Sequence, residues 1–289
     1  MPELPEVEVI RRGLAKELAA KRIAAVTVLE KRSFVGVAEQ LIGKQIGEFK
    51  RRGKLLIISL SESYTLLIHL RMSGQLIYRD GTSSGESLFA AGFPNASLIG
   101  ELPDKTTRVI IEFDDGSKLF FNDQRKFGYL KLVDSSQLES DSFLAKLGPE
   151  PLDSSFGWKD LREALGAKSN ISIKAALLDQ HRLAGIGNIY ADESLFRAKI
   201  DPRRKVSTLN SADYKRLLAG IQECLTQSID AGGSTWRNYT DALGLRGEFL
   251  DLHAAVYGRT DMPCLRCQTP IVKIKLAGRG THLCEKCQS

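Results

Sequence analysis

Two cysteine pairs near the end of the chain constrain its fold more than any other feature of the sequence. Cys264 and Cys267 form the first pair, and Cys284 and Cys287 follow after sixteen intervening residues. Each Cys-x2-Cys pair can supply two thiolates to one tetrahedral zinc site, with a hairpin between the pairs. Because sulfur then fills all four positions, we expect one structural Zn²⁺ and not a catalytic ion. Two disulfide bonds in a small tail are the alternative interpretation.

Positive charge is concentrated around these cysteines. Residues 259–289 hold six Lys or Arg residues against Asp261 and Glu285, a net charge of +4 out of +6 for the whole chain. A hairpin fixed by a metal and carrying this charge is suited to binding phosphates. A zinc ribbon could equally serve protein contacts, so this feature indicates a class of partner and not a reaction.

Composition narrows the class of protein. The chain has 289 residues, a length that favours about two domains. Hydrophobic residues make up 43% of it, a fraction too high for a disordered chain. No apolar run approaches the roughly 18 residues of a membrane span, and acidic residues stand where a signal peptide would have lysines. Cysteines gathered in one tail favour a reducing compartment. We therefore expect a soluble, non-secreted, cytoplasmic protein.

The first half of the chain predicts a helix followed by an antiparallel β-sandwich or barrel. The helix is indicated by apolar residues at three- and four-residue spacing, with Pro5 in its first turn (Val7, Ile10, Leu14 and Leu18). Short runs of β-forming residues fill 26–133, and Asp114-Asp115-Gly116 predicts a hairpin. Residues 80–103 are rich in Gly, Ser and Asn and predict a long surface loop.

The second half is predicted to be helical. Two prolines and a glycine in Gly148–Pro151 mark a boundary, and Ser211 can cap a long helix that ends near Gly232-Gly233. Cys224 lies on the apolar stripe of that helix and should be buried. The fold class is therefore α+β and multidomain. We predict a β-sandwich domain over 1–146, a linker over 147–157, a helical domain over 158–257 and a zinc finger over 258–289, with a turn at Ala277-Gly278.

The amino end combines an amine with two carboxylates. Removal of the initiator methionine would leave Pro2 as a secondary amine that is less basic than lysine. Such an amine can attack an aldehyde-level carbon and form a cationic iminium, a strong electron sink. Glu3 and Glu6 could then serve acid–base or electrostatic roles. Taken alone, Pro and Glu at a helix start are better explained as capping residues.

Six segments of the chain resemble, in order, the formamidopyrimidine-DNA glycosylase family, the bacterial repair enzymes for 8-oxoguanine. The likeness extends over nearly the whole chain, including the cysteine finger. The segments are Met1–Glu8, Arg11–Gly13, Arg51–Lys54, His69–Gly74, Asp123–Gly128 and Gly185–Tyr190.

The resemblance implies roles for particular residues. Pro2 would be the nucleophile, Glu3 would assist proton transfer at the sugar, and Glu6 belongs to the same motif. Lys54 would contact the phosphate beside the damaged nucleotide. Without the family, a lysine after Arg-Arg-Gly is better explained as a solvated turn residue.

Two further sets of residues follow from the resemblance. His69, Asn188 and Arg279 would grip the DNA backbone. Met72, Arg125 and Phe127 would enter the stack as the damaged nucleotide leaves it, because the void left by base flipping must be filled. The alternatives are a core or edge position for His69 and core positions for Met72 and Phe127, although Gly74 and Gly128 nearby favour exposed turns.

The sequence also departs from the family pattern. Lys105 is followed by Thr106, where the family often has a histidine, so any role of that histidine is lost or moved. Residues 235–249 correspond to a lid over the extruded base, but no recognition residue can be carried over from them. Gly185-x-Gly187 lacks the preceding buried strand and third glycine of a nucleotide-binding loop. In the family this stretch is the turn of a helix–two-turn–helix element.

The resemblance therefore implies a monomeric DNA glycosylase and AP lyase that removes oxidised purines (8-oxoguanine and formamidopyrimidines) from duplex DNA and cuts at abasic sites. One alternative is an endonuclease VIII-like enzyme for oxidised pyrimidines, although Leu4 and Val7 favour the purine branch. The other is a catalytically silent DNA-binding protein that uses the finger and helical domain alone.

Overall fold

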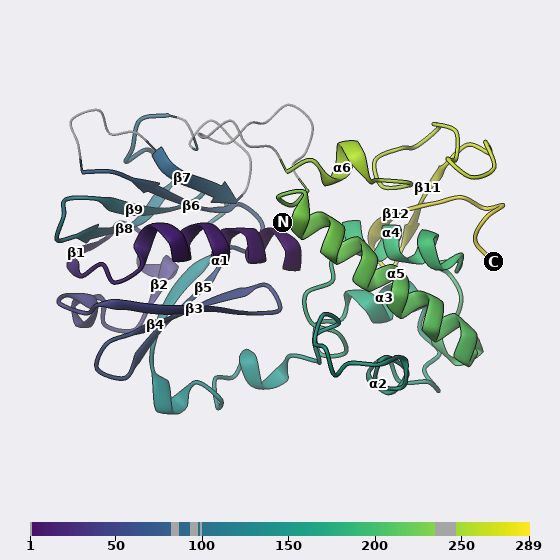
Figure 1. Ribbon diagram of the computed structural model, residues 1–289, viewed down its shortest axis with the longest axis horizontal. Coiled ribbons are helices and arrows are strands. Elements are labelled where there is room, and N and C mark those ends of the chain that lie inside the picture. Colours follow the sequence, from purple (N-terminus) through teal and green to yellow (C-terminus); the bar gives the residue numbers. More distant parts are fainter. Residues whose placement is uncertain (1, 82–86, 93–97, 99, 235–246) are drawn as a thin grey trace. The chain divides into compact units, whose positions relative to one another are not determined.

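The computed structural model describes residues 2–81, 87–92, 98, 100–234 and 247–289. Contacts divide these residues into two compact units, one over 2–145 and the other over 146–234 with 247–289. The first unit is rich in strands, and the second is helical and carries a two-stranded hairpin (Figure 1). None of the helices in the described part of the chain combines the length and apolarity that a bilayer crossing requires.

The first unit is a sandwich of two five-stranded sheets in its described residues. One sheet has the strand order β1-β8-β9-β6-β7 and the other β2-β10-β5-β4-β3. All neighbours are antiparallel except β2 and β10. The expected α+β class with an antiparallel sandwich is confirmed. The strands are β1 Ile23–Val28, β2 Phe34–Val35, β3 Ile46–Arg52, β4 Leu55–Leu60, β5 Tyr64–His69, β6 Gly74–Arg79, β7 Ser87–Gly92, β8 Thr107–Phe113, β9 Lys118–Asp123 and β10 Tyr129–Asp134.

The predicted hairpin and the predicted loop have different outcomes. Asp114-Asp115-Gly116 joins β8 to β9 as expected, with Gly116 at φ +82°. The prediction of a surface loop over the whole of 80–103 is wrong, because β7 lies within it and pairs with β6. Ala90 of β7 joins Ile77 and Phe120 in a small apolar cluster on the outer face of its sheet. The polar residues around β7 concealed this short apolar strand.

Helix α1 (Leu4–Leu18) closes one side of the sandwich, as Figure 1 shows. It packs against β3 and β7, which are edge strands of the two different sheets. Its apolar stripe is buried in the core between the sheets, as the residue spacing predicted (Val7, Ile10, Leu14 and Leu18). Gly13 lets the helix approach β7 closely, since a Cβ there would lie 2.1 Å from the Phe89 ring and would force this ring to move.

Polar contacts of Glu8 also hold α1 on β3. Glu8 accepts hydrogen bonds from Arg11 (2.8 Å) and Arg12 (2.9 Å), and it lies 3.4 Å from Nε of Arg51 in β3. Burial alone would raise the pKa of Glu8. The hydrogen bonds from both arginines and the charge of Arg51 outweigh burial and lower this pKa to about 2.

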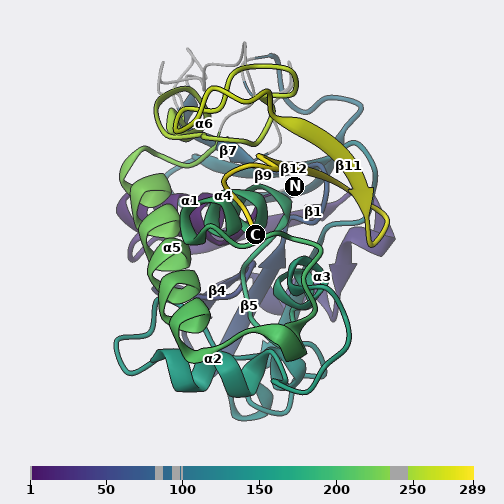
Figure 2. The same ribbon diagram turned by 90° about the vertical axis from the view of Figure 1, so that its right-hand side faces the viewer.

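The second unit is built around the long helix α5 (Ser211–Asp230), which packs against α4 and α2 (Figure 2). Its cap is Asn210 and not Ser211: Asn210 Oδ1 accepts from the Asp213 amide, and Asp213 Oδ2 accepts from the Asn210 amide, both at 3.0 Å. Cys224 is fully buried as predicted, and burial raises the pKa of its thiol to about 12. The other elements are α2 Trp158–Ala164, α3 Ile173–Leu178, α4 Asn188–Ala198, α6 Phe249–Leu252, β11 Val272–Leu276 and β12 Arg279–Leu283.

Glu8→Gln should remove an acid-dependent part of the folding free energy. Because the folded-state pKa of Glu8 is depressed, its stabilisation is present above about pH 4.5 and is lost as the pH falls toward 2. The variant should be less stable than the native protein by roughly 1–2 kcal/mol at pH 7, a discounted share of the linkage energy. Urea unfolding at pH 7, 4 and 2.5 should show this difference shrinking. Glu17→Gln on the same helix is the control, and an equal difference at every pH would contradict the prediction.

Candidate active site and DNA-binding surface

The amino end lies at the start of α1. Pro2 and Glu3 are both buried, and Glu3 immediately precedes the first helical residue. The backbone N–H of Glu3 donates to Oε2 of Glu6 at 2.7 Å, so the Glu6 carboxylate holds the segment that carries Pro2 and Glu3. A helix amino end also favours nearby negative charge. Glu6 therefore supports the geometry of the amino end.

Lys54 occupies the two-residue turn between β3 and β4. Arg52 pairs with Leu55, which leaves Gly53 and Lys54 as the turn, and Gly53 adopts φ +59°. Lys54 is only 6% exposed, so it is not the solvated turn residue of the alternative interpretation. The Glu8–Arg51 contact therefore links the helix that carries Pro2 with the hairpin that carries Lys54.

His69 ends β5 and is held in a defined tautomer. It pairs with Leu55, the residue after Lys54, and with Tyr129 of β10. Its Nδ1 accepts a hydrogen bond from the Arg71 amide at 3.0 Å, which leaves the proton on Nε2. Burial, and then the charges of Arg71 and Lys54, lower the pKa of His69 to about 3. His69 is thus a neutral hydrogen-bond donor at neutral pH.

The three expected stacking residues lie on two neighbouring connections. The first crossover, residues 70–73, leads from β5 in one sheet to β6 in the other. The second crossover, residues 124–128, returns from β9 to β10. Because Gly74 pairs with Asp123, both crossovers lie at the same end of the sandwich. These three residues, Met72, Arg125 and Phe127, are exposed or half-buried and are termed here the wedge residues.

The wedge residues are not part of the core. Phe127 is 56% exposed, although an isolated phenylalanine would ordinarily be buried. The Arg125 guanidinium lies 5.0 Å from the centre of the Phe127 ring, a cation–π distance. Met72 is half-buried. The alternative of core positions for Met72 and Phe127 is therefore wrong.

Arg71 is a candidate that the sequence analysis missed. It is exposed, adopts φ +51° and lies between His69 and Met72. Its guanidinium stands 5.9 Å from the centre of the Tyr129 ring and 5.6 Å from that of Phe143. An exposed cation held over two rings is preorganised for an anionic ligand. Its place in the His69–Gly74 segment was the only sequence signal.

In the second unit, Asn188 is connected to the hairpin β11–β12. It is the first residue of α4, after the turn that begins where α3 ends, and its Nδ2 donates to the Gly280 carbonyl at 3.0 Å. Arg279, next to Gly280, is exposed at the start of β12 after the Ala277-Gly278 turn. Asn188 of the helical region and Arg279 of the finger, the two residues of this unit expected to contact the DNA backbone, thus lie close together.

A buried ion pair fixes this arrangement, and the sequence analysis missed it. Lys174 and Asp192 are fully buried and lie 2.6 Å apart (Nζ to Oδ1). Lys174 also donates to the Gly280 carbonyl (2.9 Å) and to Thr281 Oγ1 (2.8 Å). Oδ2 of Asp192 accepts from the His282 amide at 2.9 Å. Helices α3 and α4 therefore hold β12 through charges that no solvent screens.

The four cysteines of the finger fit a metal ion. Their sulfur atoms all lie within 4.8 Å of one another, with Cys264 and Cys287 at 3.9 Å and Cys267 and Cys284 at 3.4 Å. A zinc tetrahedron with Zn–S bonds of about 2.3 Å requires sulfur–sulfur distances of about 3.8 Å. The predicted single structural zinc ion is therefore confirmed in its ligand set, and the two disulfide bonds of the alternative interpretation are not formed.

Two departures from the family pattern have different outcomes. Thr106 donates through its amide and its hydroxyl to Asp104, both at 2.7 Å, and its carbonyl accepts from the Asp123 amide at 2.8 Å. Thr106 thus stabilises a local turn through the Asp104 carboxylate, and its own side chain has no titratable group. The expected lid over 235–249 lies almost wholly outside the described residues.

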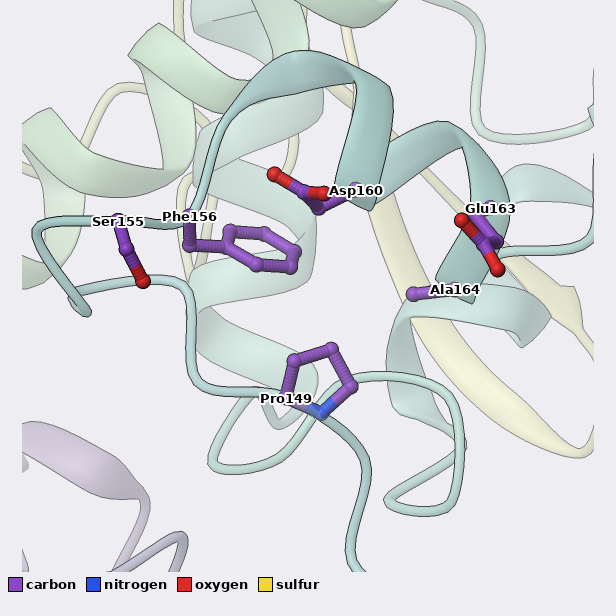
Figure 3. A pocket seen from close by; sticks show the side chains of 6 residues that line it. All are labelled: Pro149, Ser155, Phe156, Asp160, Glu163 and Ala164. Carbon is purple, nitrogen blue, oxygen red and sulfur yellow. The ribbon is translucent and has the colours of Figure 1, made fainter.

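A separate pocket of about 390 Å³ lies in the second unit (Figure 3). Asp160, Glu163 and Ala164 of α2 line one side, and Pro149 and Phe156 come from the preceding segment. Oδ2 of Asp160 accepts from the Gly157 amide at 2.7 Å and so caps α2. Two carboxylates in its lining disfavour a phosphate group, so we do not include this pocket among the residues that we propose to bind DNA.

Family models match three parts of the chain. The formamidopyrimidine-DNA glycosylase N-terminal domain matches residues 1–130, and the H2TH domain of the same enzymes matches 147–240. The zinc finger found in FPG and IleRS matches 263–289. The formamidopyrimidine-DNA glycosylase of Streptococcus mutans is 42% identical, over 100% of this chain and 99% of that protein. The chain belongs to the formamidopyrimidine-DNA glycosylase family.

Further relatives agree with this assignment. The formamidopyrimidine-DNA glycosylase of Herpetosiphon aurantiacus is 41% identical over the full length of both chains. A Lactococcus lactis FPG variant in complex with Fapy-dG containing DNA is 36% identical, with a TM-score of 0.87 and full coverage of both chains. The L. lactis Fpg complex with abasic-site DNA has a TM-score of 0.86 and covers 99% of each chain. Proteins of this family are DNA glycosylases with AP lyase activity, so the chain is an enzyme.

Lys174→Met should strongly destabilise the second unit. The substitution leaves the Asp192 carboxylate buried without its cation, which typically costs about 3–5 kcal/mol. Urea or thermal unfolding measures the loss. Lys50→Met, which removes an exposed ion pair with Glu48, is the matched control and should cost less than about 1 kcal/mol. Equal losses for the two variants would show that the buried pair does not hold β12.

Proposed function

We propose that this protein excises oxidised purines, including formamidopyrimidines and 8-oxoguanine, from duplex DNA and then cleaves the resulting abasic site. The observation that carries the proposal is the full-length similarity to solved structures that hold Fapy-dG and abasic-site DNA. The named relatives are formamidopyrimidine-DNA glycosylases, which favours the purine branch over an endonuclease VIII-like enzyme. We further propose that it acts as a monomer in the cytoplasm, where thiolate ligands stay reduced.

The proposed nucleophile is Pro2. Once the initiator methionine is removed, its nitrogen attacks C1′ of the extruded nucleotide and the base departs. The C1′–O4′ bond of the sugar then breaks, O4′ takes up a proton, and C1′ becomes part of an iminium with the Pro2 nitrogen. This iminium acidifies the C2′ proton, and successive β- and δ-elimination then cut the strand on both sides of the sugar. Glu3 transfers the protons at the sugar. This proposal is supported by the burial of Pro2 and Glu3 and by the Glu6 contact that holds them.

Extrusion of the nucleotide is assigned to the wedge residues. Unstacking a base costs a few kcal/mol, and the void must be filled by apolar groups. Phe127 and Met72 supply apolar surface, and Arg125 supplies donors for the base left without its partner. The exposure of Phe127 supports this role, because it leaves the ring available to DNA.

The DNA backbone is proposed to be held by residues of both units. Lys54 and the Nε2–H of His69 contact phosphates from the β-sandwich, and Arg71 adds a further charge beside them. Asn188 and Arg279 contribute from α4 and the finger. The zinc ion would be held by the four cysteines and supplies rigidity to the hairpin that carries Arg279.

Replacing the nucleophile tests the chemistry. Borohydride should trap a covalent complex between the native protein and 8-oxoguanine DNA, and intact mass should show the loss of one methionine. Pro2→Gly should slow both trapping and strand cleavage by about 100-fold or more. The reason is that catalytic residues that act together lose most of their combined effect when the nucleophile is replaced. Pro5→Ala, which changes a proline of the same segment, should trap normally. Unchanged trapping by Pro2→Gly, or full activity with Met1 retained, would refute the proposed nucleophile.

Replacing Arg71 tests the backbone contacts. Each phosphate contact contributes about 0.9 to the slope of log Kobs against log salt concentration. Arg71→Ala should therefore lower this slope by about 0.9 and weaken binding to damaged and undamaged duplexes alike. Arg162→Ala, which removes an exposed arginine beside the acidic pocket, is the control and should leave the slope unchanged. A slope unaffected by Arg71→Ala would exclude Arg71 from the DNA-binding surface.

A further inference from the structure

The two crossovers that carry the wedge residues are joined by one buried carboxylate. Asp123, the last residue of β9, is fully buried, and Ser73 of the first crossover is 2% exposed. The Ser73 hydroxyl donates to Oδ1 of Asp123. This hydrogen bond connects the two crossovers directly, because Ser73 follows Met72 and Asp123 begins the turn that carries Arg125 and Phe127.

The same carboxylate also organises the second crossover itself. The Arg125 amide donates to Ser73 Oγ at 2.9 Å and to Oδ1 of Asp123 at 3.1 Å. The Gly128 amide donates to the other oxygen, Oδ2, at 2.6 Å. Asp123 therefore holds this turn at both ends. Short hydrogen bonds from backbone amides to a buried charge are strong, because little solvent competes for them.

Close packing leaves the second crossover little freedom to shift. A Cβ at Gly128 would lie 3.0 Å from the His69 carbonyl oxygen and 3.1 Å from Oδ2 of Asp123. A Cβ at Gly74 would lie 2.4 Å from the Leu70 carbonyl oxygen, so the first crossover is equally tight. Both glycines thus permit backbone approaches that any side chain would prevent.

We propose that Asp123 and Ser73 form a positioning pair that holds Met72 in register with Arg125 and Phe127, so that the wedge residues enter the DNA stack together. The proposal rests on the proposed function, since it assigns a role within base extrusion. Neither Asp123 nor Ser73 is exposed enough to fill the stack itself. They act through the residues they hold, and their loss should uncouple the two crossovers without removing any DNA-contacting side chain.

Coupling between Met72 and Phe127 gives the direct test. The rate of 8-oxoguanine excision is measured in single turnover with saturating enzyme for Met72→Ala, Phe127→Ala and the double variant. If the two side chains enter the DNA stack together, losing either one removes most of the rate acceleration that they provide jointly. Each single variant should then be about tenfold slower than the native protein, and the double variant within about threefold of the slower single variant.

The same cycle is then repeated in a Ser73→Ala background. With the pair broken, Met72 and Phe127 should act independently, so that the double variant slows by the product of the two single effects. Asp123→Asn should have the same consequence, because its amide NH₂ can face the Gly128 N–H where Oδ2 accepted it. Ser73→Thr, which keeps the hydroxyl, should restore the native coupling.

The control is Ser136→Ala, which removes another Ser–Asp hydrogen bond (2.6 Å to Asp134) at the opposite end of β10. It should leave the coupling between Met72 and Phe127 unchanged, and urea unfolding of all variants shows whether stability accounts for any difference. Native-like coupling in both Ser73→Ala and Asp123→Asn, or equal loss of coupling in Ser136→Ala, would overturn the proposal. Failure of the native protein to excise 8-oxoguanine would instead refute the proposed function.

Discussion

Burial of α1 between the edges of two sheets is the constraint on which the rest of the first unit depends. The helix packs on β3 and β7, and its apolar residues complete the core that the sheets share. Each such side chain contributes roughly 1.5–3 kcal/mol when buried, so the helix cannot slide without large losses. The position of Pro2 follows, because the amino end is only two residues from Leu4, itself fully buried. The nucleophile that we propose is thereby fixed by hydrophobic packing behind it.

Charge pairs connect the functional segments in both units, and their energetics differ with burial. Glu8 is half-buried, and its contacts with Arg11 and Arg51 outweigh its desolvation and orient α1 on β3. Lys174 and Asp192 are fully buried, and their attraction offsets desolvation only because Gly280, Thr281 and the His282 amide complete the hydrogen bonds. The second arrangement is the more specific, since any displacement of β12 leaves a buried charge without its partner.

The sequence predicted those features that depend on local patterns. Apolar spacing located α1, turn residues located the β8–β9 hairpin, and cysteine spacing identified the zinc ligands. It did not predict features that depend on partners distant in the chain. Lys174 on a short helix looks like an ordinary surface lysine, and only the fold brings Asp192 and Gly280 to it. The strand β7 was hidden by polar neighbours, because its pairing with β6 outweighs local composition.

The surroundings of Asp123 also explain how Thr106 fits the fold at the position where the family resemblance led us to expect a histidine. The Thr106 side chain is bonded to Asp104, while its backbone carbonyl accepts from the Asp123 amide. Contact with β9 is therefore made by the main chain, which any residue at position 106 supplies. The Asp123 side chain is left to hold Ser73, Arg125 and Gly128. A change of side chain at position 106 should therefore leave the second crossover in place, because the crossover is held by atoms that such a change does not alter.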